Sequence, residues 1–285
     1  MISKILDFGR MVKFSHSIFA LPFAFTGAFL AFERGGFSWE KVLWIALCMV
    51  TARNVAMGFN RLVDRKIDAK NPRTIQREIA SGKISSSEGW FFVLLNAIIF
   101  AFSAKMLSNL CLILSPFVLA ILCFYSLTKR FTWLAHIFLG LAISLSPTAA
   151  WIAVAGEVEL LPILISAVIL FWIAGFDIIY ACQDFEFDIQ NKLHSIPAKF
   201  GISKALMISR VFHLITFGLL VWVGVEASLQ WIYFSGAIVI GGILFYEQSL
   251  VKPNDLSKVD KAFFDMNGII SVLFFVIVFA DLKLL

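Results

Sequence analysis

Long apolar runs are the feature of this sequence that most constrains its fold. A helix needs about 20 predominantly apolar residues to cross the hydrocarbon core of a bilayer, and runs of this kind recur along almost the whole chain. Of the 285 residues, 60% are hydrophobic and only 15% are charged, whereas soluble domains usually carry about 25% charged residues. We therefore expect an all-α integral membrane bundle of nine transmembrane helices. The expected spans are residues 16–33, 41–60, 90–108, 110–127, 134–155, 160–182, 205–225, 229–248 and 263–281.

The segments outside these runs are too short to form a soluble domain. Residues 1–13 are mixed in character and mildly amphipathic, which predicts a helix at the membrane interface rather than a tenth span. No cleavable signal peptide is expected. The longest polar stretch, residues 61–89, exceeds an ordinary connection between helices and is therefore expected to be functional. We expect residues 1–285 to form a single transmembrane domain.

The distribution of lysine and arginine predicts the orientation of the spans. If the N-terminus and the loops after the even-numbered spans share one side, that side holds all but four of the 24 basic residues. The exceptions are Arg34, Lys41, Lys105 and Lys283. Basic residues favour the cytoplasmic side, so we expect a multi-pass protein of the inner (cytoplasmic) membrane with a cytoplasmic N-terminus. The net charge of +5 is then explained mostly by the basic residues of the cytoplasmic loops. Nucleic-acid binding is not expected, because no soluble basic patch is present.

A first acidic element stands where the second expected span ends. Asn60, Asp64 and Asp68 recur every four residues, so a helix would place their side chains along one face. Ionised carboxylates near hydrocarbon are costly unless something neutralises them. Two arginines, Arg73 and Arg77, follow shortly afterwards in the sequence.

A second acidic element ends the sixth expected span, in the stretch FDIIYACQDFEFD. It carries Asp177, Tyr180, Asp184 and Asp188, whose offsets would keep all four on one face of a continuous helix. An even number of spans separates the two elements. Both are therefore expected to leave the membrane on the cytoplasmic side.

Carboxylates that share one cavity need cations. At an effective dielectric constant near 20, a like-charge pair about 5 Å apart costs roughly 3 kcal/mol. Oxygen ligands without Cys or His at ligand spacing favour Mg²⁺, which shares its shell with waters and substrate phosphates. Lys129 and Arg130 fall in the loop after the fourth span, on the same expected side. Acids, Mg²⁺ and basic side chains together are the arrangement that holds a diphosphate leaving group.

Each feature also has an ordinary structural explanation. A single pair of aspartates at a helix end is usually solvated surface charge, and Lys129 with Arg130 fits the common excess of basic residues in cytoplasmic loops. Asp177 lies well inside a span, where an ionisable residue is by default a functional candidate, although a structural hydrogen bond is the alternative. Two acidic elements on one expected side favour function.

These elements resemble the motifs of the UbiA superfamily of intramembrane aromatic prenyltransferases, nine-helix proteins that join a polyprenyl chain to an aromatic ring. The resemblance covers nearly the whole chain. The matching positions are Asn60-x3-Asp64-x3-Asp68 with Arg73-Thr74 and Ser81-Gly82, then the Tyr-x3-Lys-Arg-x-Thr stretch that begins at Tyr125, then Asp177-x2-Tyr180-x3-Asp184-x3-Asp188 with His194-Ser195.

The resemblance implies Mg²⁺-dependent transfer of a prenyl group from a polyprenyl diphosphate to a small aromatic carboxylic acid, with no obligate protein partner. Asp177 would polarise the acceptor or take its proton, and Arg53 would bind the acceptor's carboxylate, with pairing to a buried acid such as Asp177 as the alternative. The implied metal ligands are Asn60, Asp64, Asp68, Asp184 and Asp188, and these aspartates together with Asp177 would be catalytic. The implied diphosphate-binding residues are Asn60, Arg73, Arg77, Lys129 and Arg130. Candidates for contact with the acceptor or the allylic cation are Arg53, Tyr125 and Tyr180.

Several positions depart from the family's usual pattern. Arg61 stands where many members have aspartate, His136 where many have glutamine, and His194 where many have lysine, while Glu78 follows Arg77 where many have proline. The segments FSHSIFALPFAFTGAFLA and LHSIPAKFG resemble the 4-hydroxybenzoate polyprenyltransferase-like branch of ubiquinone and menaquinone biosynthesis. The alternative acceptor is 1,4-dihydroxy-6-naphthoate of the futalosine route to menaquinone.

Two other functions compete with this interpretation. A secondary transporter also carries buried acids at an ion site, but such sites lie near the bilayer midplane on broken helices. Here the acids cluster at helix exits beside arginine and lysine. A phosphotransferase of phospholipid synthesis also uses paired aspartates and divalent ions, but in one contiguous signature rich in Asp-Gly, and this chain contains no Asp-Gly pair.

Overall fold

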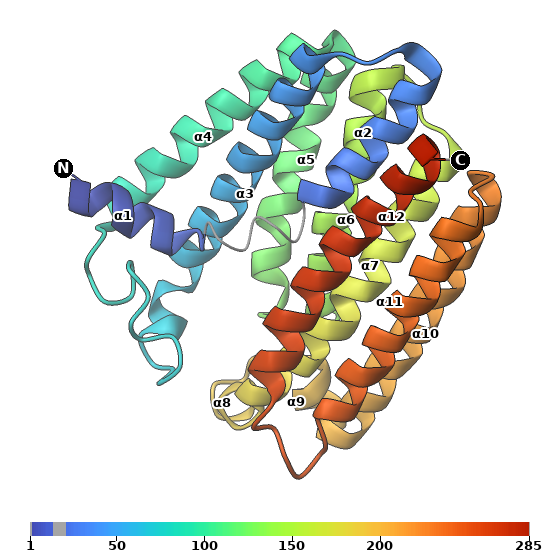
Figure 1. The fold of residues 1–285 in the computed structure, drawn as a ribbon. Coiled ribbons are helices and arrows are strands. Elements are labelled where there is room, and N and C mark those ends of the chain that lie inside the picture. The colour runs from blue at the N-terminus through green and yellow to red at the C-terminus, as the bar shows by residue number, and fades with distance from the viewer. Residues whose placement is uncertain (1, 14–20, 285) are drawn as a thin grey trace. The chain divides into compact units, whose positions relative to one another are not determined.

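The structure is a computed structural model that describes residues 2–13 and 21–284. These residues are almost entirely helical, and the described part of the chain contains no β-strand. An isolated antiparallel bridge joins Lys252 to Asp255 in the connection before the last long helix. Contacts within the chain divide it into two compact units (Figure 1).

Unit 1 consists of α1 (Ile2–Met11), α3 (Trp39–Asp68), α4 (Ser86–Leu107) and α5 (Asn109–Thr128). Within it, α3 packs along α4, and a hydrogen bond of 2.8 Å from Asn54 to Asn96 crosses the contact between these helices. An ion pair between Lys4 and Glu88 ties α1 to the first turn of α4. That turn is itself fixed by a reciprocal capping box between Ser85 and Glu88.

Unit 2 contains the other helices. The long ones are α2 (Leu21–Gly35), α6 (Ala135–Ala155), α7 (Leu160–Ala181), α10 (Ile202–Glu226), α11 (Trp231–Leu250) and α12 (Asn267–Leu284). The short ones are a 3₁₀ turn η2 (Cys182–Asp184), α8 (Phe185–Gln190), α9 (Ile196–Phe200) and a π-helical turn η3 (Lys261–Met266) that leads into α12. In Figure 1 the short helices α8 and α9 lie together at one end of this bundle.

The core of unit 2 is built from large aromatic side chains and from very close helix contacts. Trp172 of α7 is almost completely buried and packs against Phe23 and Phe176 with ring centroids 5.1 and 5.2 Å apart. Where helices come closest, only glycine fits. A Cβ atom on Gly27 or Gly140 would lie 2.4 Å from a backbone oxygen of the neighbouring helix. Small residues at such crossings are typical of helices packed in membranes.

A buried carboxylate holds the last two long helices together at the end opposite α8 and α9. Asp281 of α12, 3% exposed, accepts hydrogen bonds of 2.8 Å from the backbone N–H groups of Gln230 and Tyr233. These donors belong to the first turn of α11, where no partner within the helix is available. Asp281 therefore caps α11 from a neighbouring helix.

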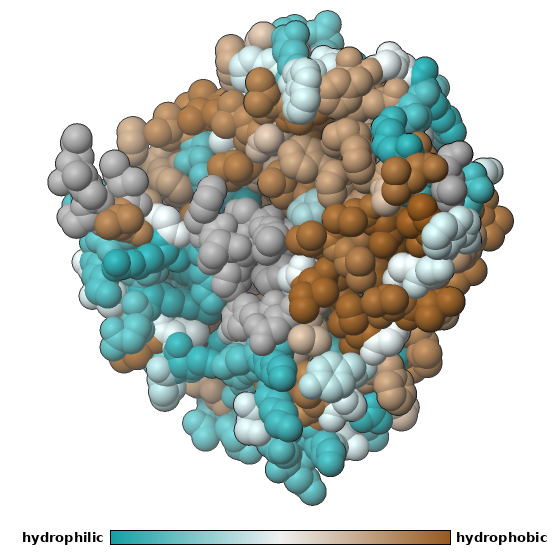
Figure 2. Space-filling model, in the orientation of Figure 1, coloured by the Kyte–Doolittle hydropathy of each residue, from teal (hydrophilic) through white to brown (hydrophobic). Residues whose placement is uncertain are grey.

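Most of the helices agree with the expected spans to within a few residues, but α3 continues past its expected end at residue 60 to Asp68. Seven helical segments of the described chain are long and apolar enough to cross a membrane. The first expected span lies partly in residues 14–20, outside the described residues, and its described part is α2. The eighth corresponds to α11, which is helical but is not among those seven. On the face that Figure 2 shows, hydrophobic side chains cover the middle of unit 2 and hydrophilic ones gather at its ends, which agrees with membrane insertion.

One expectation about local structure was wrong. The residues from Asp177 to Asp188 were expected to form a continuous helical stripe, but α7 ends at Ala181, and the 3₁₀ turn η2 separates it from α8. A 3₁₀ turn has three residues per turn instead of 3.6. The side chains after the turn are therefore rotated relative to those before it, and the helical spacing no longer places all four on one face.

Candidate functional site

The first acidic element occupies the last turns of α3, which runs without a break from the apolar span through Asp68. Asp64 and Asp68 are 0% and 3% exposed, so both carboxylates are buried rather than solvated. The Asn60 amide donates a hydrogen bond of 3.0 Å to a carboxylate oxygen of Asp64. The spacing of four residues thus produces the common face that the sequence predicted.

The polar connection after α3 folds back onto this element. Thr74 donates its hydroxyl to the backbone oxygen of Asp68 at 3.1 Å, and the Asn71 side chain accepts the backbone N–H of Arg73 at 2.9 Å. These contacts bring Arg77 to Asp68, where Nη1 lies 2.7 Å from Oδ1. Arg77 is therefore a direct partner of the acidic element, whereas the side chain of Arg73 is exposed.

A second arginine lies among these acids. Arg61 is 4% exposed, donates a hydrogen bond of 3.1 Å to Asn60, and interacts electrostatically with Asp64 and Asp68. Sequence reasoning recorded Arg61 only as a departure from the family pattern. The available signal was its spacing, since residues three and seven positions further along a helix lie on the same face. Arg61 and Arg77 together supply positive charge to the buried carboxylates of unit 1.

The first element retains an unused ligand atom. Oδ2 of Asp68 is buried and has no hydrogen-bond partner among residues 2–13 and 21–284. An orphaned buried carboxylate oxygen is costly, and a divalent cation would satisfy it, so these residues fit Mg²⁺. No group of three or more His, Cys, Asp and Glu side chains suited to a metal occurs among the described residues. Mg²⁺ commonly completes its shell with waters and phosphate oxygens, so one or two carboxylates suffice.

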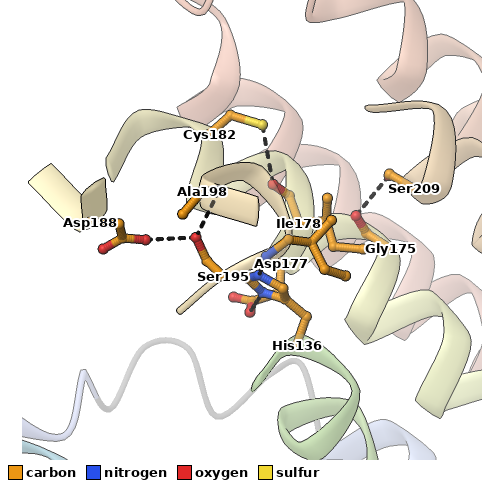
Figure 3. Close-up of polar contacts among 10 residues, drawn as sticks. His136, Gly175, Asp177, Ile178, Cys182, Asp188, Ser195, Ala198 and Ser209 are labelled. Atoms are coloured by element: carbon orange, nitrogen blue, oxygen red, sulfur yellow. Dashed lines mark hydrogen bonds and ion pairs between the residues drawn. The ribbon is translucent and has the colours of Figure 1, made fainter. Parts of the chain in front are cut away.

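The second acidic element belongs to unit 2. Asp184 closes the 3₁₀ turn, and Asp188 lies on α8, with both side chains half-buried. Ser195 donates its hydroxyl to Oδ2 of Asp188 at 2.8 Å and also accepts the backbone N–H of Ala198 at 3.2 Å as the N-cap of α9 (Figure 3). The positive charge of Lys129 acts on Asp188, and the backbone oxygen of Lys129 accepts the N–H of His194 at 2.8 Å.

Asp177 is held by a residue that sequence reasoning did not place in the site. Nδ1 of His136, in the first turn of α6, lies 2.7 Å from Oδ2 of Asp177 (Figure 3). The other ring nitrogen, Nε2, lies 3.3 Å from the backbone N–H of Ile196. The only sequence signal for His136 was its departure from the family's usual glutamine.

The remaining candidates lie in different surroundings. Nη2 of Arg53 donates to the backbone oxygens of Val12 and Lys13 at 3.3 and 3.2 Å, and its buried Nε has no partner in the part of the chain that the structure describes. Tyr125 of α5 interacts electrostatically with Arg61 and Asp64, which places it beside the first element. Tyr180 stacks on Phe263 with ring centroids 4.1 Å apart, so one face of its ring is covered. Arg130 is half-buried beside Lys129.

The fold and these contacts define a multi-pass helical membrane protein with two acidic helix ends, the first of which is paired with arginines. The UbiA prenyltransferase family model matches residues 20–269. The chain belongs to this family and is a prenyltransferase.

Individual relatives agree with this assignment. A 4-hydroxybenzoate octaprenyltransferase from Vibrio campbellii is 31% identical over 247 residues, which cover 85% of this chain and 86% of the relative. One from a Marinomonas species is 28% identical and covers 94% of this chain and 95% of the relative. Among solved structures, the apo UbiA homolog from Aeropyrum pernix superposes with a TM-score of 0.85 at 30% identity, covering 94% of this chain and 98% of that one. A UbiA homolog from Archaeoglobus fulgidus bound to GPP and Mg²⁺ has the same fold, with a TM-score of 0.78 at 22% identity. The superposition covers 97% of this chain and 99% of that one.

Proposed function

We propose that this prenyltransferase moves a polyprenyl group from its diphosphate to 4-hydroxybenzoate or a related aromatic acid in respiratory quinone biosynthesis. The observation that carries the proposal is the first acidic element, in which buried carboxylates lie beside Arg61 and Arg77 and Oδ2 of Asp68 lacks a partner among the described residues. Such a cluster suits a ligand that brings both a divalent cation and negative phosphate oxygens. Curated relatives named 4-hydroxybenzoate octaprenyltransferase support the acceptor class.

The proposed metal ligands are Asn60, Asp64, Asp68, Asp184 and Asp188. A bound Mg²⁺ supplies positive charge to the diphosphate oxygens, as the relative from Archaeoglobus fulgidus with GPP and Mg²⁺ suggests.

The chain's own residues would act on the leaving group and on the acceptor. Arg77, Lys129 and Arg130 donate hydrogen bonds that strengthen as the bond between C1 of the prenyl group and oxygen breaks and its electron pair passes to the diphosphate. A carbon–carbon bond then forms between C1 and the acceptor ring. The proton displaced from that ring carbon passes to the carboxylate of Asp177, whose side chain is 21% exposed and therefore reachable.

The proposed setting is the cytoplasmic membrane, with the N-terminus and both acidic elements on the cytoplasmic side. The Lys and Arg distribution supports this orientation, and the seven helices suited to membrane crossing support multi-pass insertion. Two further spans, formed by the first expected run and by α11, would complete the nine helices in a single domain over residues 1–285. The diphosphate would then meet polar groups while the prenyl tail stays in hydrocarbon.

The acceptor has a specific alternative. The His194-Ser195 variant of the second motif resembles enzymes of the futalosine route, whose acceptor is 1,4-dihydroxy-6-naphthoate. His194 is exposed, and its backbone N–H is donated to the backbone oxygen of Lys129 near the second element.

A direct assay tests the proposal. Membranes containing the protein are incubated with a polyprenyl diphosphate, Mg²⁺ and each acceptor separately, and the lipids are analysed by mass spectrometry. A product heavier than the acceptor by one prenyl group, formed with 4-hydroxybenzoate, is the expected result. Product only with the dihydroxynaphthoate would establish the alternative acceptor, and no product with either would overturn the proposed acceptor class.

A further inference from the structure

The imidazole of His136 has both of its nitrogens engaged. Nδ1 lies 2.7 Å from a carboxylate oxygen of Asp177, and Nε2 lies 3.3 Å from the backbone nitrogen of Ile196. A backbone N–H can only donate, so Nε2 must be the accepting nitrogen without a proton. The proton of the neutral ring is therefore on Nδ1, where it is donated to Asp177.

The orientation of the His136 ring is fixed by residues 194–196, a segment that is itself held by hydrogen bonds. Ile196 follows Ser195, which donates to Asp188 at 2.8 Å and accepts the N–H of Ala198 at 3.2 Å. One residue earlier, the N–H of His194 is bound by the backbone oxygen of Lys129 at 2.8 Å. His136 is also 4% exposed, so packing and hydrogen bonding both restrict the orientation of its ring. Figure 3 shows the carboxylates of Asp177 and Asp188 on either side of this segment.

The same geometry excludes His136 as the proton acceptor of the reaction. Its basic nitrogen is covered by the backbone of Ile196, and its other nitrogen is occupied by Asp177. Asp177 is different, because only Oδ2 is bound by His136 and the side chain is 21% exposed. The second carboxylate oxygen is the group of this pair that a substrate can reach.

On the basis of the proposed prenyl transfer, we infer that His136 is a positioning residue. Its Nδ1–H fixes one oxygen of the Asp177 carboxylate and thereby aims the other oxygen, while the backbone of the 194–196 segment keeps the imidazole in the required tautomer and rotamer. His136 itself touches no substrate. This arrangement resembles the general case in which a second group orients the acid or base that carries out the chemistry.

A kinetic double-mutant cycle tests the inference with the full-length protein in lipid nanodiscs. A hydrogen bond to a charged group corresponds to about a 10- to 100-fold change in rate, so His136→Ala should lower kcat by about that factor. The KM for the prenyl diphosphate should change by less than about threefold, because the diphosphate-binding groups are untouched. His136→Gln should restore most of the lost kcat, since its amide offers one donor and one acceptor in place of the two ring nitrogens.

The decisive comparison uses Asp177. If His136 acts through this carboxylate, His136→Ala should cost no further kcat in an Asp177→Asn background. Full additivity of the two losses, or equal losses for the alanine and glutamine variants, would overturn the inference. His213→Gln is the matched control, because His213 is another buried histidine of unit 2, on α10, and bonds Gln248 rather than Asp177. It should leave kcat per folded protein unchanged.

Nitrogen-15 NMR of histidine-labelled protein provides a readout that does not depend on activity. The expected result is a neutral His136 ring protonated at Nδ1, with a shift that changes in the Asp177→Asn variant. A ring protonated at Nε2 would overturn the inference even if prenyl transfer occurs. A wild-type protein inactive toward both acceptors would instead overturn the proposed function, and the tautomer would still decide whether His136 holds Asp177.

Discussion

Replacing Arg77 with alanine should destabilise the protein in the absence of ligands. Arg77 provides the hydrogen bond that the structure shows to the Asp68 carboxylate, at 2.7 Å, and the other oxygen of that carboxylate has no partner within the described ranges 2–13 and 21–284. The Arg77→Ala variant would therefore leave a carboxylate that is 3% exposed without any hydrogen bond among the described residues. Removing one partner of a buried ion pair lowers the free energy of unfolding by about 3–5 kcal/mol.

For Arg77→Ala, the expected loss in the free energy of unfolding is somewhat smaller than this. The Arg77 side chain is 23% exposed, so water already screens part of the interaction and can enter when the arginine is removed. A loss of about 2–3 kcal/mol corresponds to a decrease of roughly 4–12 °C in the melting temperature of a domain of this size. Thermal unfolding in detergent, with EDTA present, measures this decrease.

Mg²⁺ should restore part of the lost stability. A cation bound at Asp68 would replace the charge of the missing guanidinium, so added Mg²⁺ should raise the melting temperature more in Arg77→Ala than in the wild type. Lys83→Ala is a suitable control, because Lys83 is an exposed basic residue of the same connection. If the Arg77 and Lys83 variants melted at the same temperature, or if Mg²⁺ stabilised wild type and Arg77→Ala equally, the assignment of Asp68 as a metal ligand next to Arg77 would be refuted.

Three further outcomes are expected. Asp64→Ala and Asp184→Ala should each abolish prenyl transfer while the protein remains inserted in the membrane, as fractionation and lipid mass analysis would show; an active variant would exclude that residue as a necessary ligand. EDTA should stop product formation in purified membranes and Mg²⁺ should restore it, so activity that is indifferent to chelation would contradict the metal requirement. Asp281→Ala should lower the free energy of unfolding by about 2–4 kcal/mol, because the N–H groups of Gln230 and Tyr233 lose a charged acceptor. A melting temperature within about 2 °C of wild type would contradict the capping role.

The positions of the long helices could be predicted because each follows from a local property. A run of about 20 apolar residues predicts a span wherever it occurs, and α4 to α7 begin and end within a few residues of the expected limits, whereas α3 continues past its expected end at residue 60 to Asp68. The face formed by Asn60, Asp64 and Asp68 was predicted correctly for the same reason, since α3 continues as a regular helix through all three. Regular periodicity is visible in a sequence without knowledge of tertiary contacts.

The local geometry of the second element could not be predicted in the same way. The sequence around Cys182 contains neither proline nor glycine, so it does not predict the 3₁₀ turn that separates Asp177 from Asp188. The contact between His136 and Asp177 joins residues 41 positions apart, and a pairing of this kind depends on how α6 packs against α7. The fold-back that brings Arg77 to Asp68 depends likewise on hydrogen bonds within an irregular connection.

The length of α3 links the lipid environment to the chemistry. Its 30 residues correspond to about 45 Å of helix, whereas the hydrocarbon core of a typical bilayer is about 30 Å thick. The surplus lies mostly in the charged final turns, which hold Arg61, Asp64 and Asp68. A thicker bilayer would draw these groups toward the acyl chains and a thinner one would release them toward the headgroups, so the acyl-chain length of the host membrane should set how readily water and ions reach them.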